Sequence, residues 1–215
     1  MFLPVLYFIL PHGMNRSFSP LTCWLYRLGF CRFACTRYKV HSRNDLANQG
    51  MHLTNVAVQK KRNIPRAATL WDIQDLKEFL HHKFTGNRKR VDDAFGQIQQ
   101  IIFCSLQSVA EDMIHDVNSF ELFGFDVLLD EDLRPWLLEV NASPSLSANN
   151  DYDYQLKYQL VTDVLDVIDM EGTRSGYETN IGGFDLLQHD GKTMLELDSV
   201  QKYGCSSYIG AQLDA

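Results

Sequence analysis

Two apolar runs separated by a short acidic segment constrain the fold of this chain more than any other feature. The first run is Phe120–Leu129 and the second is Pro135–Val140, and both carry the aromatic and branched residues that strands favour. Three acidic residues, 130–132, lie between the runs, where the chain has to reverse direction. The pattern therefore predicts an antiparallel β-hairpin.

Polar residues of this hairpin predict a metal site. With a turn centred between Asp132 and Leu133, Asp126 lies directly opposite Glu139, and Asn141 shares the face of Glu139 because side chains alternate along a strand. Like charges directly opposite one another destabilise a sheet, so we expect a cation between them. Two carboxylates and an amide are oxygen ligands that suit Mg²⁺. The alternative is an ordinary hairpin with a solvated acidic face.

The other face of the hairpin is apolar, and we expect it to pack on the core. Its residues are Phe125, Val127, Trp136, Leu138 and Val140.

A second hairpin signal lies nearer the N-terminus. Two short apolar runs, 22–26 and 30–33, flank Leu28 and Gly29, which predicts a tight turn between two strands. Arg32 lies within the second run. An arginine inside an apolar strand needs an anionic partner, which its planar guanidinium can bind through two hydrogen bonds. The alternative is an arginine on an edge strand that faces water.

Apolar residues at intervals of three and four predict helices elsewhere. They place one helix over 70–82 with Thr69 as its N-cap, a long one over 91–113, and one over about 153–170. Lys157 lies beside the stripe of the last helix, where it can reach toward the hairpin or remain solvated. From residue 171 the chain is Gly-rich, and we expect an irregular, mobile tail.

Charge is divided unevenly along the chain. Residues 1–100 carry a net charge of +9 and residues 101–215 a net charge of −16, which suits an anionic substrate held over a cation. A total of −7 does not suit a nucleic-acid-binding protein. The apolar start, residues 1–10, is too short to span a bilayer. A buried strand, a start displaced into unrelated sequence and a signal peptide are the alternatives there.

Four motifs together resemble one family. GFDVLLDEDLRPWLLEVNASPSL (124–146), HLTNVAVQK (52–60), WLYRLGFCRF (24–33) and GGFDLL (182–187) are similar to motifs of the tubulin–tyrosine-ligase-like family. The resemblance covers about residues 20–190. Members of that family have an ATP-grasp fold and join an amino acid to tubulin at the cost of ATP. The resemblance therefore implies an α+β fold class: the C-terminal half of an ATP-grasp fold, incomplete, with an antiparallel sheet flanked by helices.

The resemblance also implies roles for individual residues. Asp126, Glu139 and Asn141 resemble the family's magnesium ligands, the same three residues that the hairpin spacing selects. Thr54 and Asn55 resemble nucleotide contacts, although from the residues alone they are short polar groups that a ligand or a backbone cap can satisfy. The remaining two positions, Arg32 and Lys157, resemble contacts to an incoming glutamate.

The implied activity is ATP- and Mg²⁺-dependent addition of glutamate to glutamate side chains of tubulin tails. The expected partners are tubulin or microtubules, through their acidic tails, and glutamate, with no nucleic acid and no membrane. The expected location is the cytoplasm and cytoskeleton, including a cilium or basal body. Basic residues that could hold an acidic tail, or merely confer solubility, are Lys60, Lys61, Arg62, Arg66, Arg88, Lys89 and Arg90.

Departures from the family leave other functions open. We expect residues 1–19 to be an unrelated or irregular start, 20–170 the C-terminal part of a ligase domain, and 171–215 the tail. The family's N-terminal part, with its ATP-binding lysines and phosphate loop, has no counterpart before Pro20, so we expect a chain that is inactive alone. The alternatives are a non-catalytic fragment that binds tubulin or a partner, and a different ATP-grasp ligase acting on a small amine.

Overall fold

The computed structural model describes part of the chain in detail. The described residues are 2–11, 21–34, 36, 42, 45, 47–54, 70–113, 120–148, 151–189 and 192–193. For strand β1 only the backbone is described. Within these residues, no helix is both long and apolar enough to cross a membrane.

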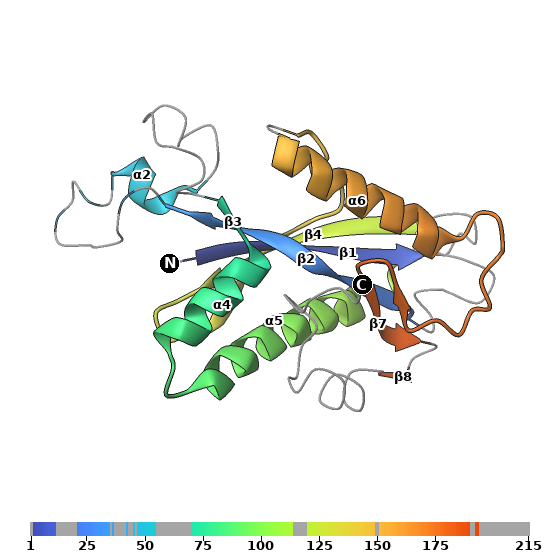
Figure 1. The fold of residues 1–215 in the computed structure, drawn as a ribbon, viewed down its shortest axis with the longest axis horizontal. Coiled ribbons are helices and arrows are strands. Elements are labelled where there is room, and N and C mark those ends of the chain that lie inside the picture. Colours follow the sequence, from blue (N-terminus) through green and yellow to red (C-terminus); the bar gives the residue numbers. More distant parts are fainter. Residues whose placement is uncertain are drawn as a thin grey trace.

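An eight-stranded sheet, in which every pairing is antiparallel, forms the centre of the described part (Figure 1). Its order is β5-β4-β1-β2-β7-β6, with β3 paired to β2 and β8 to β7. The strands are β1 (Phe2–Pro11), β2 (Cys23–Phe33), β3 (Leu70–Asp72), β4 (Phe120–Leu129), β5 (Pro135–Asn141), β6 (Asn180–Ile181), β7 (Phe184–His189) and β8 (Lys192–Thr193).

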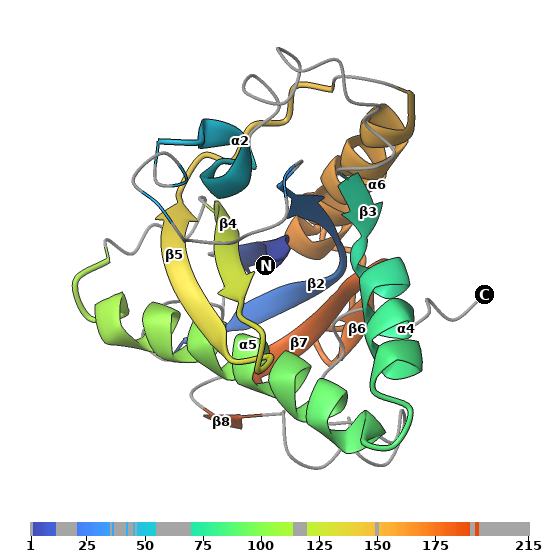
Figure 2. The ribbon, with the colours of Figure 1, turned by 90° about the vertical axis from the view of Figure 1, so that its left-hand side faces the viewer.

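Helices cover both faces of this sheet. The helices of the described residues are α2 (Gln49–His52), α4 (Ile73–Lys83), α5 (Arg88–Val109) and α6 (Asp151–Ile168). Helices α4 and α5 lie on one face and α6 lies on the other, as Figures 1 and 2 show from two directions. The fold is thus a mixed α+β arrangement with an antiparallel sheet between two helical layers.

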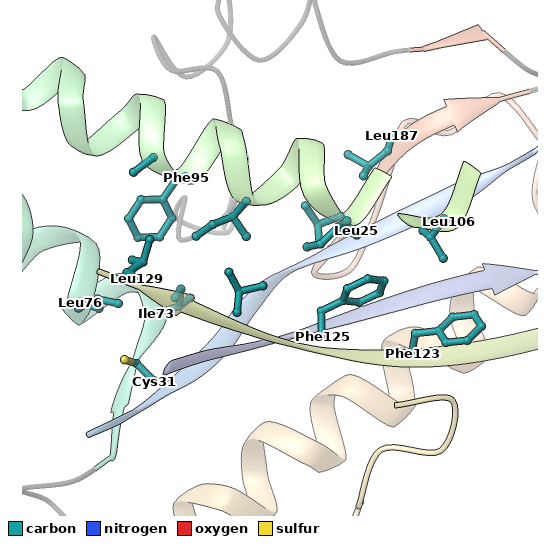
Figure 3. Packing of buried hydrophobic residues seen from close by; sticks show 14 of the residues in the cluster. Leu25, Cys31, Ile73, Leu76, Phe95, Leu106, Phe123, Phe125, Leu129 and Leu187 are labelled. Carbon is teal, nitrogen blue, oxygen red and sulfur yellow. The ribbon is translucent and has the colours of Figure 1, made fainter. Parts of the chain in front are cut away.

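The apolar stripe of α5 forms the larger core (Figure 3). Its residues Val91, Phe95, Ile98, Ile102 and Leu106 are buried against the odd-numbered residues of β4, among them Phe125 and Val127. This confirms the stripe that the sequence predicts. Only its C-terminal end differs, because Val109 ends α5 and is 42% exposed.

A smaller core lies between the sheet and α6. Buried residues of α6 pack there on β2 and β7. The buried residues of this cluster are Trp24, Tyr26, Phe30, Leu156, Leu160, Val164, Val167, Ile181, Phe184 and Leu186. Leu122, an even-numbered residue of β4, packs against the same cluster. Even-numbered residues of β4 therefore face α6, which places Asp126 on the α6 side of the sheet.

Several elements differ from the sequence expectations. Cys23–Phe33 is one continuous strand, because the register between β1 and β2 shifts between Leu6 and Phe8 and the chain bulges there without turning. Helix α4 begins at Ile73, because Leu70–Asp72 pairs with β2 as a strand. Residues 180–189 form β6 and β7 where an irregular tail is expected. Residues 2–11 form strand β1, and a strand is one of the alternatives that the sequence leaves open for the apolar start.

The apolar side of the hairpin also differs from expectation. Phe125 and Val127 are fully buried as predicted, but Trp136, Leu138 and Val140 are 45%, 56% and 42% exposed. Trp136 pairs with Leu128, an even-numbered residue of β4, and therefore lies on the α6 side instead of the predicted core side. Val140 keeps the predicted face opposite Phe125, but β5 is the end strand of the sheet order, so the core does not extend beneath it as it does beneath β4. The sequence pattern alone does not show where a sheet ends.

Candidate functional site

The hairpin of β4 and β5 brings the predicted metal ligands together. Asp126 pairs with Glu139, as predicted, and Asn141 pairs with Gly124. The side chain of Asn141 donates from Nδ2 to Oε1 of Glu139 at 3.2 Å. Because paired residues share a face, all three polar side chains lie on the α6 side of the sheet.

A β-bulge sets this pairing. The turn is one residue tighter than expected, because Leu129 pairs with Pro135. The register then shifts between Asp126 and Val127, which leaves Leu138 without a partner and restores the pair of Asp126 with Glu139. Bulges beside functional sites often redirect a side chain in this way.

The hairpin tip holds this register through hydrogen bonds of Asp130 and Asp132, for which the sequence alone predicts only a turn. Asp130 accepts hydrogen bonds from the backbone N–H groups of Asp132 and Arg134 and from the indole Nε1 of Trp136. These donors, first that of Trp136, hold the pKa of Asp130 below its usual value. Arg90, at the start of α5, donates to the backbone oxygen and the carboxylate of Asp132. An aspartate at the start of a turn commonly accepts a hydrogen bond from the backbone N–H two residues later. The place of Asp130 directly after an apolar run is therefore a turn signal that could have identified it.

The electrostatics of the site are those of two carboxylates forced together. Burial raises the pKa of Asp126, which is only 9% exposed. The charge of Arg32 opposes this rise, whereas the charge of Glu139 and a hydrogen bond between Asp126 and Glu139 increase it. The pair thus favours a proton, or another cation, between its oxygens.

Arg32 lies on the same side of the sheet as the metal ligands. It pairs with Leu3 of β1 and Leu70 of β3, so it is not on an edge strand at this point. Its guanidinium carbon lies 5.1 Å from the centre of the Phe30 ring, and Phe30 belongs to the α6-side core. Its positive charge opposes the rise in the pKa of Asp126 that burial causes.

Lys157 is buried, not solvated. Its ammonium lies 3.2 Å from the carboxylate of Asp153, one turn earlier on α6, and the two side chains are only 10% and 5% exposed. It also donates to the backbone oxygen of Ser147, in the loop that follows Asn141. Lys157 therefore connects α6 to the loop that leaves the metal ligands.

The predicted nucleotide contacts are described only in part. Thr54 is half-buried and follows α2, whose last residue is His52. Asn55 lies outside the described residues. Among the basic residues proposed for an acidic tail, Arg88, Lys89 and Arg90 are at the start of α5, and the four between 60 and 66 also lie outside the described residues.

Oxygen donors at the hairpin fit a hard cation. Within the described part of the chain, no cluster of three or more His, Cys, Asp or Glu side chains could hold a metal, so the donor set is two carboxylates and the Asn141 amide. Mg²⁺ commonly takes one or two carboxylates from a protein and completes its shell with water and phosphate oxygens. The repulsion between Asp126 and Glu139 would be relieved by such an ion.

Comparison with known proteins now identifies the family. The model of the tubulin-tyrosine ligase family matches residues 14–175. The chain belongs to the tubulin-tyrosine ligase family. The matched range includes the hairpin, Arg32 and Lys157, and the mixed antiparallel architecture agrees with a ligase domain of this family.

Several relatives of this tubulin-tyrosine ligase family member carry names that describe them as probable tubulin polyglutamylases. A mouse "Probable tubulin polyglutamylase TTLL9" is 45% identical over 196 residues, covering 90% of this chain and 41% of the relative. "Probable tubulin polyglutamylase ttll-9" of Caenorhabditis elegans is 41% identical over 200 residues, covering 92% and 46%. "Probable alpha-tubulin polyglutamylase Ttll1" of Tetrahymena thermophila is 32% identical over 187 residues, covering 82% and 45%. The chain thus spans less than half the length of these relatives.

Proposed function

We propose that this chain carries the metal-binding part of a tubulin polyglutamylase, an enzyme that ligates glutamate to glutamate side chains of tubulin tails with ATP and Mg²⁺. The observation that supports this most is the convergence of Asp126, Glu139 and Asn141 on one face of the β4–β5 hairpin. The proposal includes a location on microtubules, in the cytoskeleton and in cilia or basal bodies. The described sheet would be the C-terminal part of an ATP-grasp domain.

Each polar residue of the site has a part in this proposal. Asp126 and Glu139 would hold Mg²⁺ through their carboxylates, and Asn141 would add its amide oxygen. When bound, Mg²⁺–ATP supplies the phosphoryl group that activates a tubulin carboxyl group. Arg32 and Lys157 would bind the carboxylates of the incoming glutamate, because charge-assisted hydrogen bonds to carboxylates are stronger than neutral ones. Thr54 and Asn55 would contact the nucleotide.

The test is incorporation of radiolabelled glutamate into microtubules. We expect a longer form that contains this chain to incorporate label in the presence of ATP and Mg²⁺, and Glu139→Gln in the same form to lose incorporation. Co-sedimentation with microtubules is measured in parallel. Microtubule binding by the longer form without any incorporation would support a non-catalytic binding module instead, and incorporation by Glu139→Gln at the wild-type rate would show that Glu139 is not a required metal ligand.

A further inference from the structure

The loop that follows Asn141 is fixed to the rest of the molecule at two points. At the first, Pro144 lies directly over Gly124, so closely that a Cβ added to Gly124 would come within 3.0 Å of the Cβ of Pro144. Gly124 is the cross-strand partner of Asn141 and lies two residues before Asp126. Residues 142–148, here called the return loop, therefore fold back beside the metal ligands.

The second point is the contact of the return loop with α6. The ammonium of Lys157 donates to the backbone oxygen of Ser147, and Asp153 lies 3.2 Å from the same ammonium. With side chains only 10% and 5% exposed, Lys157 and Asp153 form a buried pair, unlike the exposed ion pairs whose net worth is small. Removing one member of a buried pair leaves the other charge uncompensated.

We propose that Asp153 is a positioning residue for the metal site. By holding the ammonium of Lys157 it fixes the return loop on α6, and the fixed loop keeps Asn141 beside Asp126 and Glu139. This inference rests on the metal site of the proposed function. It goes beyond the proposed function because Asp153 touches neither metal nor substrate in that mechanism.

A merely structural role for Asp153 makes a different prediction. Asp153 is one of two acidic residues in the first turn of α6, where a negative charge stabilises any helix. In that case its loss would lower the stability of α6 without changing the metal site. Asp163 provides the matched control, because it is also buried and lies on the same helix. It accepts hydrogen bonds from Tyr26 and from the backbone N–H of Gly183, and both of these partners are remote in sequence from the return loop.

The experiment uses this chain with Mn²⁺ alone as the probe, and measures two quantities. The Mn²⁺ dissociation constant is followed by electron paramagnetic resonance, and acetylation of Lys157 by mass spectrometry. We expect Asp153→Asn to weaken Mn²⁺ binding by about tenfold, the lower end of the effect of removing partners of metal ligands. It should also raise acetylation of Lys157 several-fold. Asp163→Asn should lower the unfolding temperature and change neither readout; Asp166→Asn, at an exposed position of α6, replaces it as control if that variant does not fold.

A double-mutant cycle shows whether Asp153 acts through Lys157. If Asp153 acts through Lys157, the double variant Asp153→Asn with Lys157→Met should bind Mn²⁺ with the same affinity as Lys157→Met alone. The reason is that Lys157→Met already removes the ammonium that Asp153 holds. The proposal is overturned if Asp153→Asn shows wild-type acetylation of Lys157 and wild-type Mn²⁺ affinity, or if the control variant changes both readouts as much as Asp153→Asn does. It is also overturned if the losses of Mn²⁺ affinity in the two single variants simply add in the double variant. If the wild-type chain binds no Mn²⁺ while Asp153→Asn still exposes Lys157, the metal site of the proposed function fails, and the role of Asp153 in it fails too.

Discussion

At the scale of single residues, the repulsion between Asp126 and Glu139 leads to the first prediction. Replacing Glu139 by Gln removes one of two facing negative charges, a pairing worth roughly 0.2–1 kcal/mol across a sheet. We expect Glu139→Gln to be as stable as the wild type or slightly more stable in a metal chelator, and to lose the stabilisation that added Mg²⁺ gives the wild type. Thermal unfolding with EDTA and with Mg²⁺ measures both effects. A variant that still gains stability from Mg²⁺ would contradict the assignment.

A second residue-scale prediction concerns Glu178. Its own backbone N–H, and then the hydroxyl and backbone N–H of Ser175, lower its pKa to about 2. Because the folded pKa lies below the unfolded value of about 4.3, this carboxylate stabilises the fold above pH 4.3, and the contribution is lost as the pH falls toward 2. An NMR titration of the Glu178 carboxyl carbon should show the low midpoint, and Ser175→Ala should move it toward 4.3. An ordinary midpoint in the wild type would refute the prediction.

Residue pairing in the hairpin shows how far sequence reasoning reaches at this scale. The facing pair of Asp126 and Glu139 is predicted correctly, although the turn is one residue tighter than assumed and the unpaired Leu138 compensates. Neither change can be read from the sequence, because Leu137 and Leu138 are adjacent leucines and either of them could be the paired residue. The buried pair of Lys157 with Asp153 was also missed, although their spacing of one helical turn is a signal for it.

At the scale of elements, the close packing of the return loop on β4 leads to the third prediction. Gly124→Ala would place a Cβ 3.0 Å from that of Pro144, so the loop must shift by a few tenths of an ångström. Overpacking of this kind typically costs about 1–3 kcal/mol, and the lower end applies because the return loop is largely exposed. We expect reduced stability in urea and weaker Mn²⁺ binding.

Gly86 supplies the control for this substitution. It lies between α4 and α5, and a Cβ there would have no heavy atom within 4 Å, so Gly86→Ala should change neither stability nor Mn²⁺ binding appreciably. Equal behaviour of the two alanine variants would show that the contact of Pro144 with Gly124 does not constrain the loop.

Helices were predicted better than strands in this molecule for a physical reason. An amphipathic helix such as α5 buries one stripe against whatever it meets, so its period of 3.6 is visible in the sequence. A strand in the middle of a sheet depends on its neighbours. The chain at 22–33 resembles two strands and a turn, but partners on both sides keep it as one continuous β2 with a bulge.

At the scale of the whole molecule, the order of the strands depends on contacts between distant segments. Strand β7 pairs with β2, and the buried side chains of Arg27 and Asp185 join these strands by two hydrogen bonds, of 2.5 and 2.6 Å, across 158 positions of sequence. The motif GGFDLL is visible in the sequence, but no local pattern indicates that its aspartate faces an arginine of β2. Pairing of this kind follows from chain topology, which explains why the tail was expected to be irregular.

The Arg27–Asp185 pair gives the last prediction. Both side chains are almost fully buried, at 1% and 3% exposure, so Arg27→Met leaves an uncompensated charge in the sheet. Breaking a buried pair in this way typically costs about 3–5 kcal/mol, whereas replacing both partners by apolar residues is often neutral. Urea unfolding should therefore show a large loss for Arg27→Met and recovery of most of it in Arg27→Met combined with Asp185→Leu. A double variant that loses the sum of the two single effects would mean that the pair, together with the hydrogen bond from Asn180 to Asp185, is needed to seat β7 against β2.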